Sequence, residues 1–248
     1  MAEWWERFFD EAYLRLWAET IGHERTDEQV KGVRELLGLS PGTEILDLAC
    51  GHGRHTVPLA QAGYRMTGLD LSKAFLETAR NSARDAGVEI DFHWGDMREI
   101  PWRDRFDAVI NLFTSFGFFE HDRENQQVLD GVFRALKPGG KFLIDLANRD
   151  RLMQIWQDRA WDEVNGVPLW RERQFEPVSG RVTETIRWLE DGQTRERTFR
   201  VRSYNATELT GMLQDAGLKP IGYYGDYQLA PFSKDTWRLI VMSEKGTD

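Results

Sequence analysis

A carboxylate followed by two glycines gives this chain a stretch suited to binding a small ligand. Asp47 lies in the apolar run 45–49, and Gly51 and Gly53 follow it. Glycine lets the backbone turn sharply and approach a ligand with no Cβ in the way. A carboxylate inside an apolar run needs a partner. The sequence leaves two partners open for Asp47, namely N–H groups of the glycine loop or a cationic amine of a ligand.

A second carboxylate stands where a nucleoside would need it. Residues 64–70 have the pattern of a strand, and Asp70 is its last residue. An acid at the tip of the second parallel strand can accept hydrogen bonds from both hydroxyls of a ribose. The glycine loop and Asp70 together therefore predict a cofactor that contains adenosine.

Alternating strands and helices must position these residues. The run 45–49 predicts a buried strand, and the spacing of residues 54–62 predicts a helix whose first N–H groups face the ligand. Ser72 is predicted to cap a helix that stops at Gly87, and Asn205 is predicted to cap a later helix that ends at Gly217. Further strands are predicted over residues 89–94, 106–113, 142–147, 218–224 and 237–242, and further helices over 122–136, 148–158 and 208–216.

The order Asp-x-Ala-x-Gly-x-Gly in residues 47–53 resembles the first motif of class I S-adenosylmethionine-dependent methyltransferases. The dinucleotide-binding fingerprint would need glycine or alanine where this chain has Thr56. Later landmarks of the methyltransferase family follow in order, and the resemblance covers residues 44–147 closely. It implies a Rossmann-like α/β fold with a seven-stranded, mostly parallel sheet and helices on both faces. It also implies S-adenosyl-L-methionine as cofactor and S-adenosyl-L-homocysteine as product.

The resemblance places cofactor contacts in four loops. These contacts are Asp47, Ala49, Cys50, Gly51, His52 and Gly53, then Asp70 and Leu71, then Asp96, Met97 and Arg98, and finally Asn111 and Leu112. Asp96 is expected to accept the adenine amino group and Met97 to pack on the ring, while a turn or cap role for Asp96 is the alternative. The sequence Asn111-Leu112-Phe113-Thr114 departs from the Asn/Asp-Pro-Pro-Tyr/Phe motif of enzymes that methylate base amines, which argues against that substrate.

Two further cofactor contacts are implied before the glycine loop. Tyr13 lies in an amphipathic segment, residues 4–18, that either caps the sheet or closes over the cofactor. Arg25 precedes a helix that Thr26 and Gln29 are predicted to start as a capping box. In similar sequences an arginine here reaches the cofactor carboxylate, and a solvated surface arginine is the alternative.

After residue 147 the alternation of strands and helices stops. Residues 161–204 alternate like strands, and Asn165-Gly166, Ser179-Gly180 and Asp191-Gly192 are typical of turns between them. The chain is therefore predicted to form a cofactor domain from residues 1–149 and 204–248, with an antiparallel β insertion of three or four strands over 150–203. In similar methyltransferases such an insertion roofs the acceptor pocket. A surface for homodimerisation is the alternative.

Methyl transfer requires little acid–base catalysis by the protein, which mainly positions the cofactor and the acceptor. A general base is optional, and His121 and Tyr204 are the candidates, with structural roles as the alternative. Cys50, the only cysteine, reads as a small loop residue rather than a nucleophile. No metal ligands recur at a useful spacing, so no metal site is predicted.

Composition narrows the partners. The formal charge of −9 argues against nucleic acid and anionic membranes, which attract basic surfaces, and favours a small-molecule acceptor over tRNA or protein. A single cysteine excludes an internal disulfide, and no apolar run has the length of a membrane span, so a cytoplasmic enzyme is expected. The rival functions are a nicotinamide-dependent oxidoreductase and a non-catalytic module that binds the cofactor.

Overall fold

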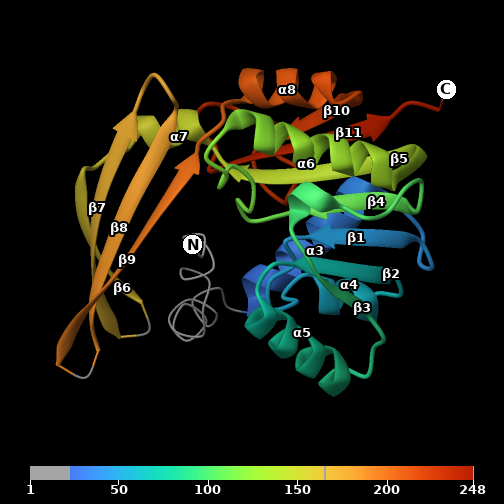
Figure 1. Ribbon diagram of the computed structural model, residues 1–248, viewed down its shortest axis with the longest axis horizontal. Coiled ribbons are helices and arrows are strands. Elements are labelled where there is room, and N and C mark those ends of the chain that lie inside the picture. Colours follow the sequence, from blue (N-terminus) through green and yellow to red (C-terminus); the bar gives the residue numbers. More distant parts are fainter. Residues whose placement is uncertain (1–22, 165, 191, 248) are drawn as a thin grey trace.

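The computed structural model describes residues 23–164, 166–190 and 192–247 of the 248-residue chain. They form a seven-stranded sheet of order β10-β11-β5-β4-β1-β2-β3 and a four-stranded sheet of order β6-β7-β8-β9. Figure 1 shows the smaller sheet standing beyond the carboxyl ends of the parallel strands. The predicted α/β fold, with its separate antiparallel sheet, is confirmed. Within the described part of the chain, no helix is long and apolar enough to cross a membrane.

The larger sheet is parallel at its centre. Its strands are β1 (Glu44–Leu48), β2 (Arg65–Asp70), β3 (Asp91–Trp94), β4 (Phe106–Asn111), β5 (Leu136–Ala147), β10 (Leu218–Tyr224) and β11 (Arg238–Lys245). Strand β1 pairs in parallel with β2 and β4, whereas β11 runs antiparallel to both β5 and β10. The chain winds outward in opposite directions from β1 and β4. In open α/β sheets ligands bind at such a switch point, beyond the carboxyl ends of the strands.

Helices cover both faces of this sheet. They are α3 (His23–Leu37), α4 (Thr56–Gln61), α5 (Lys73–Asp85), the 3₁₀ turn η1 (Met97–Glu99), α6 (Asp122–Ala135) and α8 (Ala206–Asp215). The short helix α7 (Arg149–Gln154) follows β5 and lies beside the smaller sheet (Figure 1). The predicted caps are present at two of them. Ser72 Oγ accepts from Phe75 N at 3.3 Å at the start of α5, and Asn205 and Glu208 form a capping box at α8. The capping box predicted for Thr26 and Gln29 is wrong, because both residues lie inside α3.

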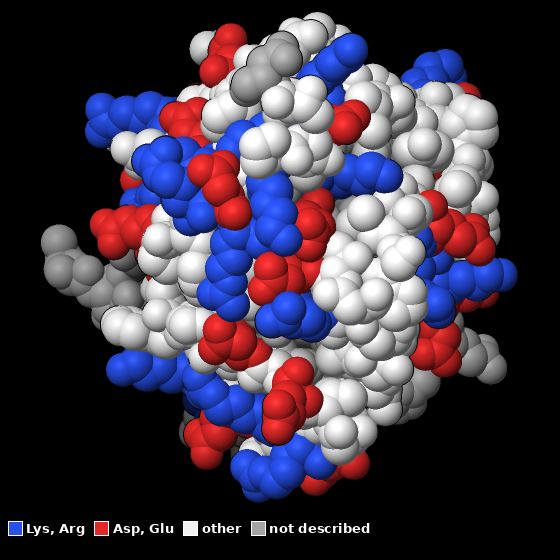
Figure 2. Space-filling view, turned by 90° about the vertical axis from the view of Figure 1, so that its right-hand side faces the viewer, with Lys and Arg blue, Asp and Glu red and all other residues white. Residues whose placement is uncertain are grey.

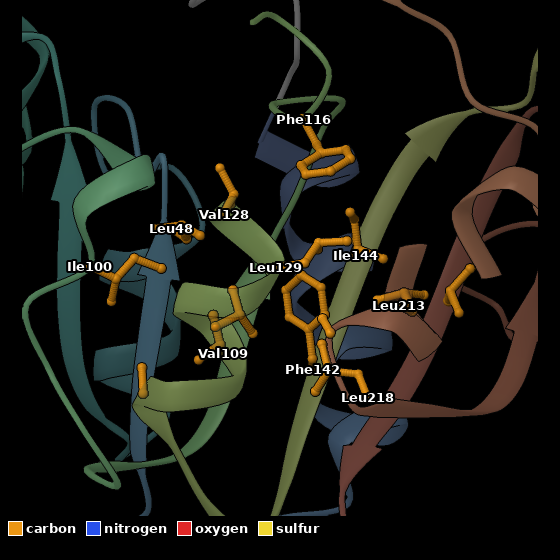
Figure 3. Close-up of a cluster of buried hydrophobic side chains, with 14 of the residues drawn as sticks. Leu48, Ile100, Val109, Phe116, Val128, Leu129, Phe142, Ile144, Leu213 and Leu218 are labelled. Carbon is orange, nitrogen blue, oxygen red and sulfur yellow. The ribbon is translucent and has the colours of Figure 1, made fainter. Parts of the chain in front are cut away.

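Two apolar cores follow from the alternation of side chains along the buried strands. Leu46 and Leu48 pack in one core with residues of α6 and α8, while Ile45 packs in the other with α3 and α4. Figure 3 shows Leu129 of α6 lying over Phe142 of β5 in the first core. Burial on both faces explains why these strands read as almost continuous apolar runs.

The smaller sheet is a meander of antiparallel strands. Its strands are β6 (Arg159–Val164), β7 (Val167–Glu176), β8 (Arg181–Glu190) and β9 (Gln193–Arg202). One face holds a small apolar cluster that includes Leu169, Ile186 and Trp188. The other face exposes Trp161 and Trp170, which lie opposite each other on β6 and β7. This sheet therefore has far less apolar core than the larger one.

The face at the amino-terminal ends of the parallel strands carries charges of both signs. Figure 2 shows Lys and Arg interspersed there with Asp and Glu. Lys137 contacts Glu44 at 3.3 Å and Asp107 at 2.9 Å, and Lys245 contacts Asp104 at 2.7 Å. These pairs neutralise one another, so this face presents no continuous basic patch.

Candidate cofactor and acceptor site

Asp47 is a nearly isolated carboxylate at the end of β1. Its residue is only 3 % exposed, and its one hydrogen-bonding partner among the described residues is Thr56, whose Oγ1 donates to Oδ2 at 2.6 Å. Burial raises the pKa of Asp47 to about 7, partly offset by the Thr56 hydrogen bond and reinforced by the charge of Asp70. The N–H groups of the glycine loop do not bind it. The carboxylate is thus free to receive a cationic donor, the second of the two partners that the sequence left open.

The loop after β1 is shaped by left-handed backbone. Ala49, Gly51 and Gly53 have φ of 61°, 58° and 83°. A Cβ on Gly53 would lie 3.1 Å from the Cβ of Ala79, whereas one on Gly51 would meet only Phe75, at 3.8 Å. The glycine at 53 is therefore required by close packing on α5. The glycine at 51 is required by its backbone conformation, and the space beside it stays open toward a ligand.

Asp70 ties this loop to the next one. Its Oδ2 accepts from Gly51 N and its Oδ1 accepts from Ser72 N, both at 2.8 Å. Burial raises its pKa, although the N–H groups of Ser72 and Gly51 oppose the rise. A carboxylate has about four acceptor positions, so acceptor capacity remains for a ligand beside the backbone N–H groups of Gly51, Leu71 and Ser72. The neighbouring Leu71 continues the platform, and its carbonyl oxygen accepts from Trp94 Nε1 at 2.9 Å.

Asp96 caps the 3₁₀ turn after β3. Its Oδ1 accepts from Arg98 N at 2.8 Å, and its Oδ2 accepts from Arg98 Nη2 at 2.6 Å. Arg98 also donates to Glu124 Oε1 at 2.7 Å, which joins this turn to α6. Of the two roles left open for Asp96 the cap is present, and contact with adenine stays a prediction. Met97 is partly buried against the first core.

Asn111, the last residue of β4, carries an unsatisfied acceptor. Its Nδ2 donates to Leu48 O at 2.8 Å, but its Oδ1 has no partner among the described residues although the residue is only 1 % exposed. A buried polar atom left unpaired costs about 1–3 kcal/mol. The next residue, Leu112, is buried. Because β1 and β4 are adjacent, with Asp47 in register with Ile110, the oxygens of Asp47 and Asn111 belong to the same switch point.

Two strained residues follow β4. Phe113 and Thr114 have φ of 61° and 62°, a left-handed conformation that costs residues other than glycine on the order of 1–3 kcal/mol each. Asp145 holds both of them. Its Oδ2 accepts from Phe113 N and its carbonyl oxygen accepts from Thr114 N, each at 2.9 Å. The turn at the carboxyl end of β4 is thus fixed by a residue of β5.

Asp145 is itself the centre of a buried network that sequence reasoning missed. It is fully buried, and it accepts from Tyr227 Oη and from Arg238 Nε, each at 2.6 Å. Burial lowers the pKa of Arg238, but the charge of Asp145 outweighs it and leaves the pKa raised. Burial and the Asp145 charge raise the pKa of Tyr227 well above its usual value. These partners lie 82 and 93 residues from Asp145, too far for any local pattern to connect them.

Arg54, a second residue that sequence reasoning missed, lies against the same turn. Its guanidinium stands over the Phe113 ring, 4.8 Å from the centroid. Its Nη1 donates to Gln29 Oε1 at 2.6 Å and to Thr26 Oγ1 at 3.2 Å. The two residues predicted as a capping box therefore bind Arg54. Burial lowers its pKa to about 10, and Arg25 adds to the lowering.

The remaining predicted cofactor contacts differ in their surroundings. Arg25 is exposed on α3, and Tyr13 lies outside the described residues. Cys50 is buried, and burial followed by the charges of Asp70 and Asp47 raises the pKa of its thiol well above the usual value. The thiol therefore stays protonated, as a small loop residue would. Burial lowers the pKa of His52, whose ring meets Phe75 edge-on at 6.4 Å.

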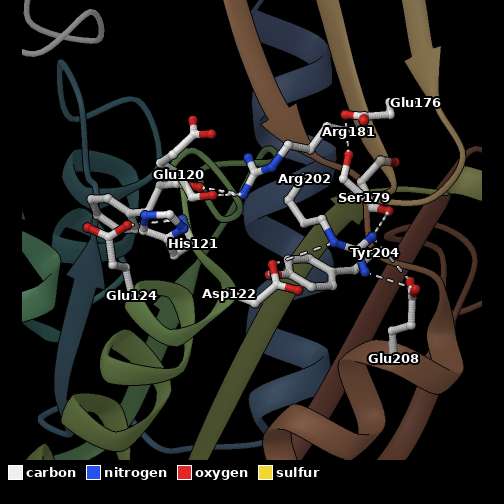
Figure 4. Close-up of polar contacts among 12 residues, drawn as sticks. Glu120, His121, Asp122, Glu124, Glu176, Ser179, Arg181, Arg202, Tyr204 and Glu208 are labelled. Carbon is white, nitrogen blue, oxygen red and sulfur yellow. Dashed lines mark hydrogen bonds and ion pairs between the residues drawn. The ribbon is translucent and has the colours of Figure 1, made fainter.

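The two candidate bases lie near the junction of the sheets (Figure 4). Tyr204 is 1 % exposed and donates to Asp122 Oδ1 at 2.9 Å. Burial and the Asp122 charge raise its pKa, which opposes loss of its proton at neutral pH. His121 is exposed at the start of α6, where its backbone N donates to Glu124 Oε2 at 3.0 Å. No cluster of three or more potential metal ligands occurs among the residues that the structure describes.

The smaller sheet is fastened to the loop between β4 and α6. Arg202 N donates to Gly117 O at 2.8 Å, and Arg181 Nη2 donates to the carbonyl oxygens of Phe119 and Glu120. Gly117 has φ of 102°, and a Cβ there would lie 2.4 Å from the Arg202 carbonyl oxygen. The backbones of the loop and of β9 are therefore in direct contact, with glycine required between them.

Comparison with known proteins agrees with this geometry. Residues 45–140 match a family model described as a methyltransferase domain. A cypemycin N-terminal methyltransferase of a Streptomyces species is 29 % identical over 82 % of this chain and 84 % of its own length. A ubiquinone biosynthesis O-methyltransferase of Alkalilimnicola ehrlichii is 28 % identical over 90 % of both chains.

A solved structure shares the whole fold. It is an S-adenosylmethionine-dependent methyltransferase from Clostridium acetobutylicum ATCC 824, with a TM-score of 0.80 and 21 % identity. The alignment covers 97 % of this chain and 98 % of that one. The likeness extends over both sheets, so the smaller sheet belongs to an architecture found elsewhere.

Proposed function

Because this chain is a class I S-adenosylmethionine-dependent methyltransferase, we propose that it methylates a small molecule held between the turn after β4 and the four-stranded sheet. The observation that carries this proposal is the attachment of Arg181 and Arg202 to the loop between β4 and α6. The attachment sets the smaller sheet beside the carboxyl edge of β4. A roof at this place would exclude water and orient the acceptor.

The residues of the switch point fit the cofactor. Bound S-adenosylmethionine supplies a methyl group on a positively charged sulfur. Asp47 and the unsatisfied Oδ1 of Asn111 offer acceptors for its amino group, and Asp70 offers its remaining acceptor capacity to the ribose. Gly51 leaves room beside them. The other proposed contacts are Ala49, Cys50, His52, Gly53, Leu71, Asp96, Met97, Arg98, Leu112 and the exposed Arg25.

The chain's own part in the reaction is positioning. Asp145 fixes Phe113 and Thr114 in their left-handed conformation, which sets the floor beneath the proposed acceptor. An amine acceptor would lose its proton to water and need no base, whereas a hydroxyl would benefit from one. The exposed His121 suits that task better than Tyr204, whose raised pKa keeps its proton bound.

The names of two relatives support a small acceptor. Relatives matching most of this chain carry names of enzymes for ubiquinone biosynthesis and for the cypemycin N-terminus.

We propose residues 1–149 with 204–248 as the cofactor domain and residues 150–203 as the roof. A homodimer through the exposed Trp161 and Trp170, and a cytoplasmic location inferred from the single cysteine, are proposals of the same kind.

Calorimetry with S-adenosylhomocysteine tests the cofactor site. Loss of a charged acceptor costs about 1.5–3 kcal/mol, so Asp70→Ala should weaken binding tenfold or more. Asp85→Ala, an equal change of charge at an exposed position near the end of α5, is the control and should bind like the wild type. Unchanged affinity in folded Asp70→Ala would contradict the assignment, as would binding of NAD in place of S-adenosylhomocysteine.

Transfer of isotopically labelled methyl groups tests the acceptor class. The enzyme and labelled S-adenosylmethionine would be incubated separately with a small-metabolite extract, purified tRNA and a protein extract. Label entering the small-metabolite fraction, with release of S-adenosylhomocysteine, is the expected result. Label confined to tRNA or protein would contradict a small acceptor, and no turnover with any fraction would favour a non-catalytic module.

A further inference from the structure

We propose that the guanidinium of Arg54 is the receptor for a carboxylate at the boundary between the cofactor and the acceptor, an inference that rests on the proposed function. Arg54 lies between α3, through Gln29, and the turn after β4, through Phe113. Methyl transfer brings the amino-acid part of the cofactor and the acceptor together at this edge of the sheet. A carboxylate from either molecule could therefore reach Arg54.

The first observation is the set of partners that Arg54 has. Its hydrogen bonds go from Nη1 to two neutral oxygens, those of Gln29 and Thr26. Among the described residues, its Nε and Nη2 donate no hydrogen bond and no carboxylate lies within ion-pair distance. A partly buried cation without a counter-ion is costly, because it has lost water and gained no opposite charge.

The second observation is the contrast with Arg238 across the same aromatic ring. Arg238 lies 5.6 Å from the Phe113 centroid and donates to Asp145 at 2.6 Å. Arg54 lies 4.8 Å from that centroid and has no such partner in the described part of the chain. Both arginines lie over one aromatic side chain, and among the described residues only Arg238 has a carboxylate partner.

The third observation is the balance of charge around Arg54. Arg25 adds positive charge, and Asp145, whose charge also reaches Arg54, is committed to its ion pair with Arg238. Asp47 contributes part of a negative charge, because its pKa of about 7 leaves it incompletely ionised at neutral pH.

The other titratable groups beside Arg54 supply no counter-ion. Burial lowers the pKa of His55 well below its usual value and raises that of Tyr227 well above, so both are neutral. The site therefore holds more positive charge than negative.

A carboxylate would supply the negative charge that the guanidinium of Arg54 lacks among the described residues. The unused N–H groups of a guanidinium can bind both oxygens of a carboxylate at once, which adds direction to the attraction. Arg25 is the alternative receptor, but it is exposed, and ion pairs of exposed side chains contribute little. Arg54 is held in place by Gln29, Thr26 and Phe113, so less entropy is lost when an anion binds to it.

The test compares S-adenosylhomocysteine with 5′-methylthioadenosine, which has the same nucleoside and thioether but no amino-acid group. If the cofactor supplies the carboxylate, Arg54→Gln should weaken S-adenosylhomocysteine at least tenfold and change 5′-methylthioadenosine less than twofold. Arg54→Lys should recover part of the loss. Arg34→Gln, an equal change at an exposed position of α3, is the matched control. Retained binding of 5′-methylthioadenosine shows that the variant is folded.

Acetate distinguishes the second source. If the acceptor supplies the carboxylate, Arg54→Gln should leave both nucleoside affinities unchanged. Acetate should then raise the Tm of the wild-type complex with S-adenosylhomocysteine above that in equal chloride, and should not do so for the Arg54→Gln complex.

The proposal is overturned if Arg54→Gln changes neither the nucleoside preference nor the acetate effect, or if Arg25→Gln rather than Arg54→Gln carries the loss. Failure of the wild type to bind S-adenosylhomocysteine at all would instead overturn the proposed function.

Discussion

The four-stranded sheet and the carboxyl edge of the larger sheet differ in whether their buried charged side chains have partners of opposite charge. In the smaller sheet, Glu184 accepts from Arg171 at 2.6 Å and from Arg173 at 2.8 Å. At the carboxyl edge, and within the residues that the structure describes, Asp47 has only the hydroxyl of Thr56 and Arg54 has only neutral hydrogen-bond partners. Side chains of similar burial are thus paired in one region and unpaired in the other.

This difference separates structural charges from ligand-binding ones. Opposite charges facing each other across strands support the sheet and its register. An unpaired buried charge weakens the folded state, so it is retained where a ligand supplies the missing partner. By this criterion the arginines of the smaller sheet are structural. Asp47 and Arg54 are the charges that we propose for ligand binding.

The largest effect is expected where the carboxyl edge does contain a paired charge. Asp145→Asn would leave Arg238 buried without its anion, and breaking such a pair typically costs about 3–5 kcal/mol. Urea unfolding followed by circular dichroism would measure the loss, with the exposed Asp150→Asn of α7 as control. A loss below about 1 kcal/mol would show that the network around Asp145 is not structural, and the division between paired and unpaired charges would fail there.

A smaller, local effect is expected in the four-stranded sheet. Glu184→Gln removes the shared acceptor of Arg171 and Arg173, and lost hydrogen bonds to a charged group cost about 1.5–3 kcal/mol. Amide hydrogen exchange should quicken in β7 and β8, while the strands of the larger sheet and the affinity for S-adenosylhomocysteine stay unchanged. Glu163→Gln, exposed on β6, should alter neither. Equal loss of protection in both sheets would show that they unfold as one unit.

Because the carboxyl group of Asp47 is buried without an ionic partner among the described residues, it should make the free energy of unfolding depend on pH. Its pKa is raised from 3.8 to about 7 on folding, so between these values the folded protein holds a proton that the unfolded chain has released. The free energy of unfolding therefore falls as the pH rises from about 4 to about 7. Asp47→Asn lacks this fall, and without cofactor it should be more stable than the wild type at pH 8 but not at pH 4.

Urea midpoints at the two pH values check this expectation, with Asp85→Asn as control. At pH 8 the same variant should bind S-adenosylhomocysteine more weakly than the wild type, because the ionised carboxylate is lost. A variant less stable than the wild type at pH 8 without cofactor would mean that the protein itself already pairs Asp47.

The smallest effect is expected on the exposed face of the four-stranded sheet. Arg187 contacts Glu172 and Glu196, each at 2.6 Å, but all three side chains are open to solvent. Exposed ion pairs contribute little and are screened by salt. The Tm of Arg187→Gln should match that of the wild type at 0.15 M salt, a concentration at which the Debye length is about 8 Å. A clear drop there would extend the structural role of paired charges to solvent-exposed residues.

Local sequence patterns predicted the parts of the molecule that depend on neighbours in the chain. Asp70 and Gly51 lie within one βαβ unit, and the structure joins them directly. The caps at Ser72 and Asn205 also depend on residues within three positions. The contacts of Asp70 and Asn111 with the cofactor stay predictions.

Contacts between distant residues were beyond local patterns. In the sequence, Asp145 is one more acidic residue in a predicted strand, and no pattern near it predicts its hydrogen bonds with Tyr227 and Arg238. Thr26 and Gln29 match a capping box, yet they serve Arg54 from inside a helix. Tyr204 looks like a base in sequence and packs in the core in three dimensions. In each case a partner that the fold brings close decided the role.

The contact between Gly117 and Arg202 restricts how the acceptor preference that we propose for the four-stranded sheet could be transferred between relatives. A chimera that took β6–β9 from a relative and kept the native loop would join two backbones shaped for different partners. Gly117 leaves no room to adjust, and the carbonyl groups of Phe119 and Glu120 would lose Arg181, which lies in β8 and would be replaced. The loop 116–121 and the four-stranded sheet therefore form a single exchangeable module, although 37 residues or more separate them in the chain at this end of the sheet.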